Sequence, residues 1–416
     1  MGPNNGGAFA LIVGAYTALT FHRRSLSFIS HHLRTDKILN TQQLGIAASL
    51  NALIFSVTKF AAWTYVNSIG AKWLLLLSIF VATISAFFIA FSTTAWTFLI
   101  IWGLAGLSHG SSWPPCGFFV RTLCSADSFG VWWGILSSAS NLSALIGPIF
   151  TTFLIANYNW TWQTLYFVIS VICFGFLIPS LKYLPNLYTF QGEIRDSKTT
   201  LSRSTWISLL TDFPFMFLCL AYVTLSTVKF SFSNWIHLCL IDSNVSSAIA
   251  IYYITFMEAG GLFGSLTSGV FADWLSKIFP AKGRSKIILI FFYSCLLFIS
   301  VYWMLTLISQ ENASQTNILC HAFFTGIFIA SCYSMYGMVP MEIKGSESAG
   351  RYSSVIDLAG SLGGLIAGYP VSLLQSYYGW IGVMIFLEVN VVITAAVLWI
   401  VLKLHSNEPS DIKKHD

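Results

Sequence analysis

The chain has 416 residues, of which 56% are hydrophobic and 9% are charged, and its mean hydropathy is +0.72. Soluble domains carry about 25% charged residues, so this composition excludes an ordinary soluble domain and indicates a membrane protein built of many helices. The net charge of +5 is spread over loops, which argues against a nucleic-acid partner. The eight cysteines form no CxxC motif, so we expect no metal site and no cofactor.

Apolar windows long enough to cross a bilayer recur along the whole chain, and we count about twelve. They cover residues 8–33, 43–67, 72–92, 95–121, 128–157, 161–182, 206–236, 246–272, 286–308, 316–340, 348–376 and 379–403. We therefore predict an all-α polytopic membrane protein with two six-helix halves, at 1–182 and 206–404. A polar segment at 183–205 reads as a cytosolic linker between the halves, and residues 405–416 as a cytosolic tail.

The distribution of basic residues predicts the orientation of the chain. If both termini are cytosolic, 15 of the 21 Lys and Arg residues fall on the cytosolic side, and only Arg34 and Lys37 fall in loops of the opposite side. Basic residues concentrate in cytosolic loops of membrane proteins, so this asymmetry predicts cytosolic termini.

Two adjacent arginines, Arg23 and Arg24, interrupt the first apolar window, and no acidic residue lies within ten positions of them. Each arginine near the middle of a bilayer costs roughly 2.5 to 3.5 kcal/mol. Adjacent helical residues point about 100° apart, so we expect Arg23 to face a central cavity and Arg24 to point elsewhere. The alternative is that both arginine side chains extend to the membrane–water interface. An arginine in a cavity suits an anionic ligand, because its planar fork matches phosphate or carboxylate oxygens.

An internal repeat points to a second cation. Residues 130–148 match 350–370 at an offset of 220 with one late insertion, which indicates duplication of a six-helix unit. The counterpart of the first window then contains a single charge, Lys229. Arg23 and Lys229 would supply one cation from each half, and a dianionic phosphoryl group between them would remove their repulsion. An accidental lysine at the interface is the alternative for Lys229.

Other ionisable residues fall within the apolar windows, namely Lys59, Glu258, Asp357 and Glu388. Pairs of Lys59 or Lys229 with Glu258 or Asp357 would satisfy buried charge and could re-form during a transport cycle. For Lys59 and Glu388 we favour static ion pairs. We expect Asp357 to be partly buried with a basic or hydroxyl partner. Polar residues on windows expected to line the cavity are His109, Ser140 and Asn141.

Three motifs carry a family resemblance. They are Trp113-Pro-Pro-Cys-Gly117, the run from Phe129-Gly130 through Trp132-Trp133-Gly134 to Asn141, and the pair Gly147-Pro148. They resemble the organophosphate:phosphate antiporter family of the major facilitator superfamily, and within it the endoplasmic-reticulum glucose-6-phosphate transporter branch of solute carrier family 37. The similarity covers essentially all twelve windows.

The resemblance implies specific roles. It places the family's substrate arginine on Arg23, with Arg24 as its basic neighbour, the second substrate cation on Lys229, and a substrate-side tyrosine on Tyr16. Lys59-Phe60, Glu258 and Glu388 also match, and Asp273 belongs to a conserved Gly-x-x-x-Asp loop that is retained with Gly269. The first-half copy of that loop has decayed, with Trp63 and Asn67 at its key positions. Leu19, Thr20 and Asp357 also depart from the family pattern, which leaves the preferred sugar phosphate open.

The resemblance also implies a function. The expected activity is exchange of glucose 6-phosphate for inorganic phosphate across the endoplasmic reticulum membrane, functionally coupled to a luminal glucose-6-phosphatase, with no enzymatic chemistry. Lys413 and Lys414 near the end of the chain resemble a dilysine retrieval signal. The alternatives are exchange of another sugar or glycerol phosphate, or a sensor that does not transport. A membrane phosphatase is set aside, because the sequence lacks the clustered Arg/His/Asp arrangement that phosphoryl transfer would need.

Overall fold

The computed structural model of the protein describes residues 5–123, 129–185, 211–279, 284–310, 314–336, 339 and 345–406, and every regular element in these ranges is a helix. The chain divides into two compact units. The first contains residues 1–195 and two short later segments, 250–255 and 368–373, and the second contains the rest. The predicted linker and tail lie almost entirely outside the described residues, so the domain boundaries remain a prediction.

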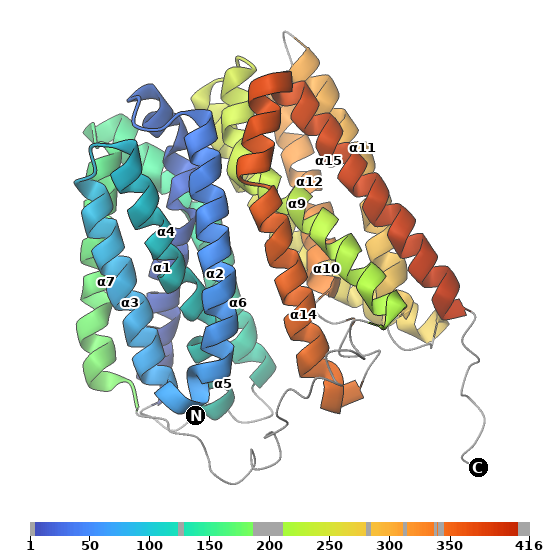
Figure 1. Ribbon diagram of the computed structural model, residues 1–416, viewed down its shortest axis with the longest axis horizontal. Coiled ribbons are helices and arrows are strands. Elements are labelled where there is room, and N and C mark those ends of the chain that lie inside the picture. Colours follow the sequence, from blue (N-terminus) through green and yellow to red (C-terminus); the bar gives the residue numbers. More distant parts are fainter. Residues whose placement is uncertain are drawn as a thin grey trace. The chain divides into compact units, whose positions relative to one another are not determined.

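The first unit begins with seven helices that run alongside one another (Figure 1). They are α1 (Asn5–Thr35), α2 (Thr41–Ile69), α3 (Ala71–Ala90), α4 (Ala95–Ser111), α5 (Trp113–Leu123), α6 (Phe129–Tyr158) and α7 (Trp162–Tyr183). Local chemistry sets several of these ends. Asn40 accepts a hydrogen bond from the backbone N–H of Gln43, and the Gln43 side chain accepts one from the backbone N–H of Asn40, which closes a capping box before α2. Gly70, with φ of 89°, turns the chain from α2 into α3.

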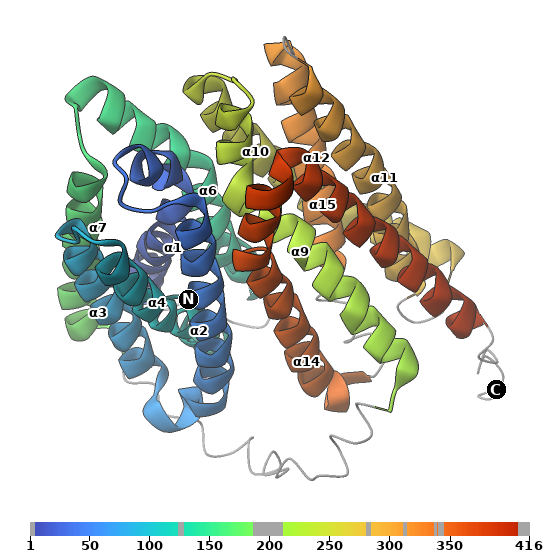
Figure 2. The same ribbon diagram turned by 45° about the horizontal axis from the view of Figure 1, so that its top comes forward.

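The second unit contains the later helices, among which α11 and α12 lie side by side (Figure 2). They are α9 (Phe213–Asp242), α10 (Ser247–Ile278), α11 (Arg284–Ser309), α12 (Gln315–Tyr336), α14 (Gly345–Ile366) and α15 (Tyr369–Ser406). Gly379, with φ of 65° and ψ of −170°, is non-helical and divides α15 into two helical segments.

Two predicted windows differ from the helices. The window 95–121 divides into α4 and α5 at Ser112, because Pro114 and Pro115 have no N–H with which to continue the hydrogen-bond ladder. The predicted window 348–376 is interrupted by a short turn, since α14 ends at Ile366 and α15 begins at Tyr369, and its predicted boundary with the window 379–403 coincides with the non-helical Gly379. The late insertion that the internal repeat required falls at this break.

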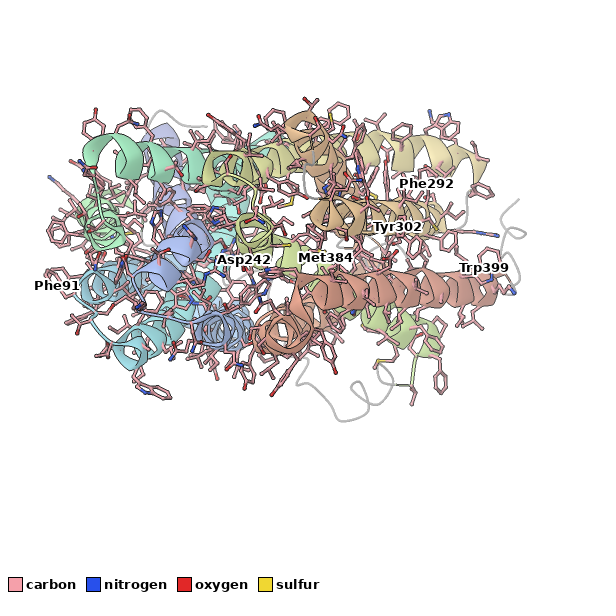
Figure 3. The ribbon with its side chains drawn as sticks, turned by 90° about the horizontal axis from the view of Figure 1, so that it is seen from above. Phe91, Asp242, Phe292, Tyr302, Met384 and Trp399 are labelled. Carbon is pink, nitrogen blue, oxygen red and sulfur yellow. The ribbon has the colours of Figure 1, made fainter. Side chains whose placement is uncertain are left out.

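Eight described segments are long and apolar enough to cross a membrane, and one of them, Val355–Leu404, covers most of the window 348–376 and all of the window 379–403. The three other predicted windows correspond to α1, to α4 with α5, and to α6. Large apolar side chains are exposed along these helices, as expected for surfaces that face lipid. Figure 3 labels several of them, Phe91, Phe292, Tyr302 and Trp399, together with the buried Met384.

The two units repeat the same internal pairings. Helix α1 packs against α6 in the first unit, and α9 packs against α14 in the second. At the end of α1, the indole N–H of Trp162 donates to Asp36 over 3.0 Å, and at the end of α9 the indole of Trp380 donates to Asp242 over 2.9 Å. This correspondence supports the duplication inferred from the sequence.

The Trp162–Asp36 bond predicts a loss of stability on substitution. Trp162 is 1% exposed, and a hydrogen bond to a charged acceptor contributes about 1.5 to 3 kcal/mol. Trp162→Phe should lower the thermal unfolding midpoint of the purified protein in detergent. Trp96→Phe is the control, because Trp96 is 73% exposed and its substitution should leave the midpoint unchanged. An equal midpoint for the two variants would show that the bond contributes nothing.

Candidate functional site

The first cationic group lies in the first unit around the ring of Phe55. Arg23, half-buried on α1, has its guanidinium carbon 5.6 Å from the centroid of that ring, and Nζ of Lys59 lies 6.0 Å from the same centroid. Cations within about 6 Å of an aromatic face are attracted to it. The structure therefore brings Lys59, for which we expected a static ion pair, to the same ring as Arg23.

Close backbone packing of α2 against α4 sets this arrangement. A Cβ atom added to Gly106 would lie 2.9 Å from the carbonyl oxygen of Asn51, and one added to Gly110 would meet the carbonyl of Phe55 and the amide of Lys59. Small residues permit such close approach between membrane helices. The glycines of α4 thus hold the α2 turn that carries Asn51, Phe55 and Lys59 directly against the end of α4 that carries His109.

His109 belongs to a buried hydrogen-bond chain that joins three helices. Its Nε2 lies 3.3 Å from Nδ1 of His22 on α1, and its Nδ1 lies 3.3 Å from the side-chain amide of Asn51 on α2. The Asn51 amide N–H also donates to the carbonyl of Trp102 over 2.9 Å. His22 and His109 are 0% and 2% exposed. His109 was predicted to line a cavity, whereas the structure buries it inside the first unit.

Tyr16 and Arg24 lie beside this group on α1. Tyr16 is buried, its ring centroid lies 5.3 Å from that of Trp113, and Arg23 and Arg24 both act on it electrostatically. Trp113 opens the Trp-Pro-Pro-Cys-Gly motif, so the motif packs directly against the first helix. Arg24 is half-buried, like Arg23.

Ser140 and Asn141 lie on α6, which packs against α1, and both are half-buried. The residue that links the two helices is Ser143, whose hydroxyl lies 2.8 Å from that of Thr20 and donates to the carbonyl of Thr17 over 3.0 Å. Sequence reasoning missed Ser143. Its spacing from Ser140, three positions along a helix, was the available signal, since such residues share one face.

The second cationic group lies in the second unit, around Lys229 on α9. Nζ of Lys229 lies 3.0 Å from the ring centroid of Tyr333 on α12 and 5.8 Å from that of Phe230. The Tyr333 ring lies 5.3 Å from that of Tyr222, which in turn lies 4.5 Å from Tyr336. Sequence reasoning missed this tyrosine cluster. Two tyrosines three positions apart on one helix, Tyr333 and Tyr336, were its signal.

Helix α14 reinforces the tyrosine cluster by packing closely on α9. A Cβ atom on Gly360 would lie 2.5 Å from the ring of Tyr222, and one on Gly363 would lie 2.5 Å from the carbonyl of Val223. Both glycines belong to the repeated segment found in the sequence. The close α9–α14 approach therefore fixes the ring of Tyr222 and, through it, the ring that Lys229 contacts.

The acidic residues of the second unit are more dispersed. Glu258 and Glu388 are half-buried on α10 and α15, and Asp273 is exposed near the end of α10. The expectation that Asp357 is partly buried is wrong, because its side chain is exposed on α14, where it acts electrostatically on Tyr222. Gly260, which follows Glu258, does approach another backbone closely, at the carbonyl of Phe323 on α12. The predicted lysine–acid pairs stay predictions.

Each unit thus places a cation from an apolar segment against aromatic rings, and glycine contacts hold α2, which carries Phe55, in the first unit and α9, which carries Lys229, in the second. Such groups attract anions, because an anion lowers the electrostatic cost of holding the cation in an apolar surrounding. Among the described residues, no group of three or more His, Cys, Asp or Glu side chains is arranged to hold a metal ion.

Comparison with known proteins agrees with this fold. A family model described as Major Facilitator Superfamily matches residues 6–368. Among solved structures, the chain is similar to a bacterial homologue of the human lysosomal transporter Spinster, with a TM-score of 0.76 and 14% identity over 98% of both chains. It is also similar to the nucleoside transporter NupG, with a TM-score of 0.75 and 11% identity over 95% of this chain and 99% of that one.

Curated relatives share low identity over most of the chain. A probable hexose phosphate transport protein of Chlamydia muridarum is 24% identical over 96% of this chain and 91% of its own length. The membrane sensor protein UhpC of Escherichia coli strain K12 is 24% identical over 92% of this chain and 89% of its own. Sugar phosphate exchanger 3 of Mus musculus is 22% identical over 70% of this chain and 65% of its own.

Proposed function

We propose that this chain, which belongs to the Major Facilitator Superfamily, is a secondary transporter of sugar phosphates. The observation that carries the proposal is the presence, in each unit, of a span-embedded cation beside aromatic rings, Arg23 at Phe55 and Lys229 at Tyr333. The near full-length similarity to a protein named as a probable hexose phosphate transporter supports the same substrate class.

In detail, the proposed activity is exchange of glucose 6-phosphate for inorganic phosphate across the endoplasmic reticulum membrane by alternating access. Arg23 and Lys229 would both hold the phosphoryl group, with Arg24 as the neighbouring cation. Ser140 and Asn141 on α6 would contact the sugar. Because Tyr16 and His109 are buried, we assign them to support of α1 beside Arg23, and not to contact with the sugar.

Counterflow tests the proposal directly. Purified protein is reconstituted into vesicles loaded with inorganic phosphate, and labelled glucose 6-phosphate is added outside. An exchanger should accumulate the label to a level that depends on internal phosphate, and vesicles without internal phosphate are the control. Equal, background uptake in both would contradict transport.

A sensor is the second candidate, favoured by the similarity to the membrane sensor protein UhpC. A sensor of this fold would bind the same anions through Arg23 and Lys229 but would not move them. Saturable binding of glucose 6-phosphate to the purified protein, combined with no counterflow, would identify it. Binding together with counterflow would exclude this alternative.

Substitutions that keep the charge should separate the roles of the two cations. Arg23→Lys should be poorly tolerated, because an ammonium group cannot offer two parallel donors to phosphoryl oxygens. Lys229→Arg should be milder, since the lysine acts as a point charge. Neutralising either cation removes a charge-assisted contact of about 1.5 to 3 kcal/mol, or roughly 10- to 150-fold in apparent affinity measured by inhibition of counterflow.

The loss should be similar for phosphate and for glucose 6-phosphate, because both present the same group to the same cations. Lys403→Ala is a matched control, since Lys403 is an exposed lysine at the end of α15. An Arg23→Ala protein with normal phosphate affinity and reduced sugar-phosphate affinity would contradict the assignment.

The proposed location, the endoplasmic reticulum membrane with both termini in the cytosol, is supported by the basic-residue asymmetry and by Lys413 and Lys414. Replacing both lysines by Ser should release the protein to later membranes of the secretory route, while counterflow by purified protein stays intact. Fluorescence microscopy of tagged protein measures this. Unchanged retention of the double variant would show that the tail is not the retrieval signal.

A further inference from the structure

The buried hydrogen-bond chain of His22, His109 and Asn51 contains one unsatisfied nitrogen atom among the described residues. Nε2 of His22 is fully buried and has no hydrogen-bond partner among the described residues. Around it are the rings of His109, Trp102 and Tyr166, with centroids 5.1, 5.8 and 6.1 Å from that of His22. Buried polar atoms are normally paired, so an unpartnered nitrogen at the end of a hydrogen-bond chain calls for a functional explanation.

Proton accounting shows what this nitrogen can do. A neutral imidazole has one N–H and one lone pair. In one arrangement, Nδ1–H of His22 donates to Nε2 of His109, and Nδ1–H of His109 donates to the Asn51 oxygen, which leaves a bare lone pair on Nε2 of His22. The chain then accepts a proton at that nitrogen and keeps every one of its hydrogen bonds. In the reverse arrangement, Nε2 of His22 carries the N–H, and no lone pair is left over.

Arg23 is the charged side chain that acts on the histidine pair. Arg23 directly follows His22 in the sequence and acts electrostatically on His109. Other ionisable side chains on the helices of the first unit include Arg24 and Tyr16 on α1, Lys59 on α2, Lys72 in the first turn of α3, Cys116 on α5, Tyr158 at the end of α6, and Tyr166 on α7. Among the described residues of 5–185, Asp36 is the one acidic residue. Its carboxylate lies at the end of α1, where it accepts a hydrogen bond from the indole N–H of Trp162.

This setting makes protonation of the pair depend on what is bound at Arg23. With Arg23 as the neighbouring charge, an added proton on the pair is costly away from water. A phosphoryl anion at Arg23 lowers the positive potential at the two rings and so favours the proton. Linkage is reciprocal, so a proton on the pair strengthens anion binding by the same factor.

We propose that His22 and His109 form a proton-binding site that is filled together with the anion site at Arg23. The inference rests on the proposed anion site and adds a second ligand, the hydrogen ion, taken from solvent onto the lone pair of an imidazole nitrogen. Binding of a phosphoryl anion therefore takes up as much as one proton, and the anion's affinity rises as pH falls, by up to about tenfold per pH unit.

Calorimetric titration of the purified full-length protein tests this proposal. The probe is sodium monofluorophosphate, because it keeps its double negative charge between about pH 6 and 8, where histidines titrate and phosphate itself changes charge. Titration in two buffers of different ionisation enthalpy gives both the affinity and the number of protons taken up. We expect proton uptake on binding and tighter binding at the lower pH.

The decisive variant is His22→Asn combined with His109→Gln. An Asn amide places a polar atom near the position of Nδ1 and a Gln amide near that of Nε2, so the shared hydrogen bond can persist without an ionisable ring. This variant should still bind the anion, but without proton uptake and with affinity independent of pH. His321→Gln is the matched control. His321 is fully buried in the second unit with Ser300 and Thr325 as partners, and its loss should leave proton uptake unchanged.

Two results would overturn the inference while leaving the proposed function intact. They are wild-type binding without proton uptake, and uptake by the double variant equal to that of the wild type. Failure of the wild type to bind monofluorophosphate would instead overturn the anion site itself, and the inference would fall with it.

Discussion

The cost of holding cations inside apolar helices is the constraint on which the rest of this structure depends. A charge removed from water is tolerated only where its surroundings replace part of its hydration. In the first unit that role falls partly to Phe55, whose ring lies within about 6 Å of both Arg23 and Lys59. The ring can serve both because the glycines of α4 bring the α2 backbone close and hold the turn that carries Phe55 in place.

The second unit solves the same problem with other residues. Lys229 lies over Tyr333, and glycine contacts between α9 and α14 fix the neighbouring Tyr222. The indole–carboxylate bonds at the ends of α1 and α9 repeat as well, although the residues around them differ. The two units thus share the pairing of their first helix with a later one and the presence of a cation, while the aromatic side chains beside the cations come from different helices, α2 in the first unit and α12 in the second.

The first unit also contains a polar interior that an ion-binding role alone does not require. The chain from Asn51 through His109 to His22 joins α1, α2 and α4 at the level of Arg23. Buried polar networks stabilise a unique arrangement when every member is satisfied, and they mark a functional site when one is not. Here the unsatisfied atom belongs to His22, which directly precedes Arg23 on α1.

The sequence by itself determined the helical membrane class and the positions of most spans, and it singled out Arg23 and Lys229 as charges within apolar segments. Hydropathy and the cost of a charge in an apolar segment are local properties, so each can be evaluated residue by residue. Only the tertiary structure placed Lys59 at the ring of Arg23, brought His22 to His109, set Tyr333 under Lys229, exposed Asp357 and ended α14 at Ile366. The physical reason is that a span apolar on all sides carries little periodic signal of which face is buried. That choice is made by glycine contacts and hydrogen bonds between helices far apart in the chain.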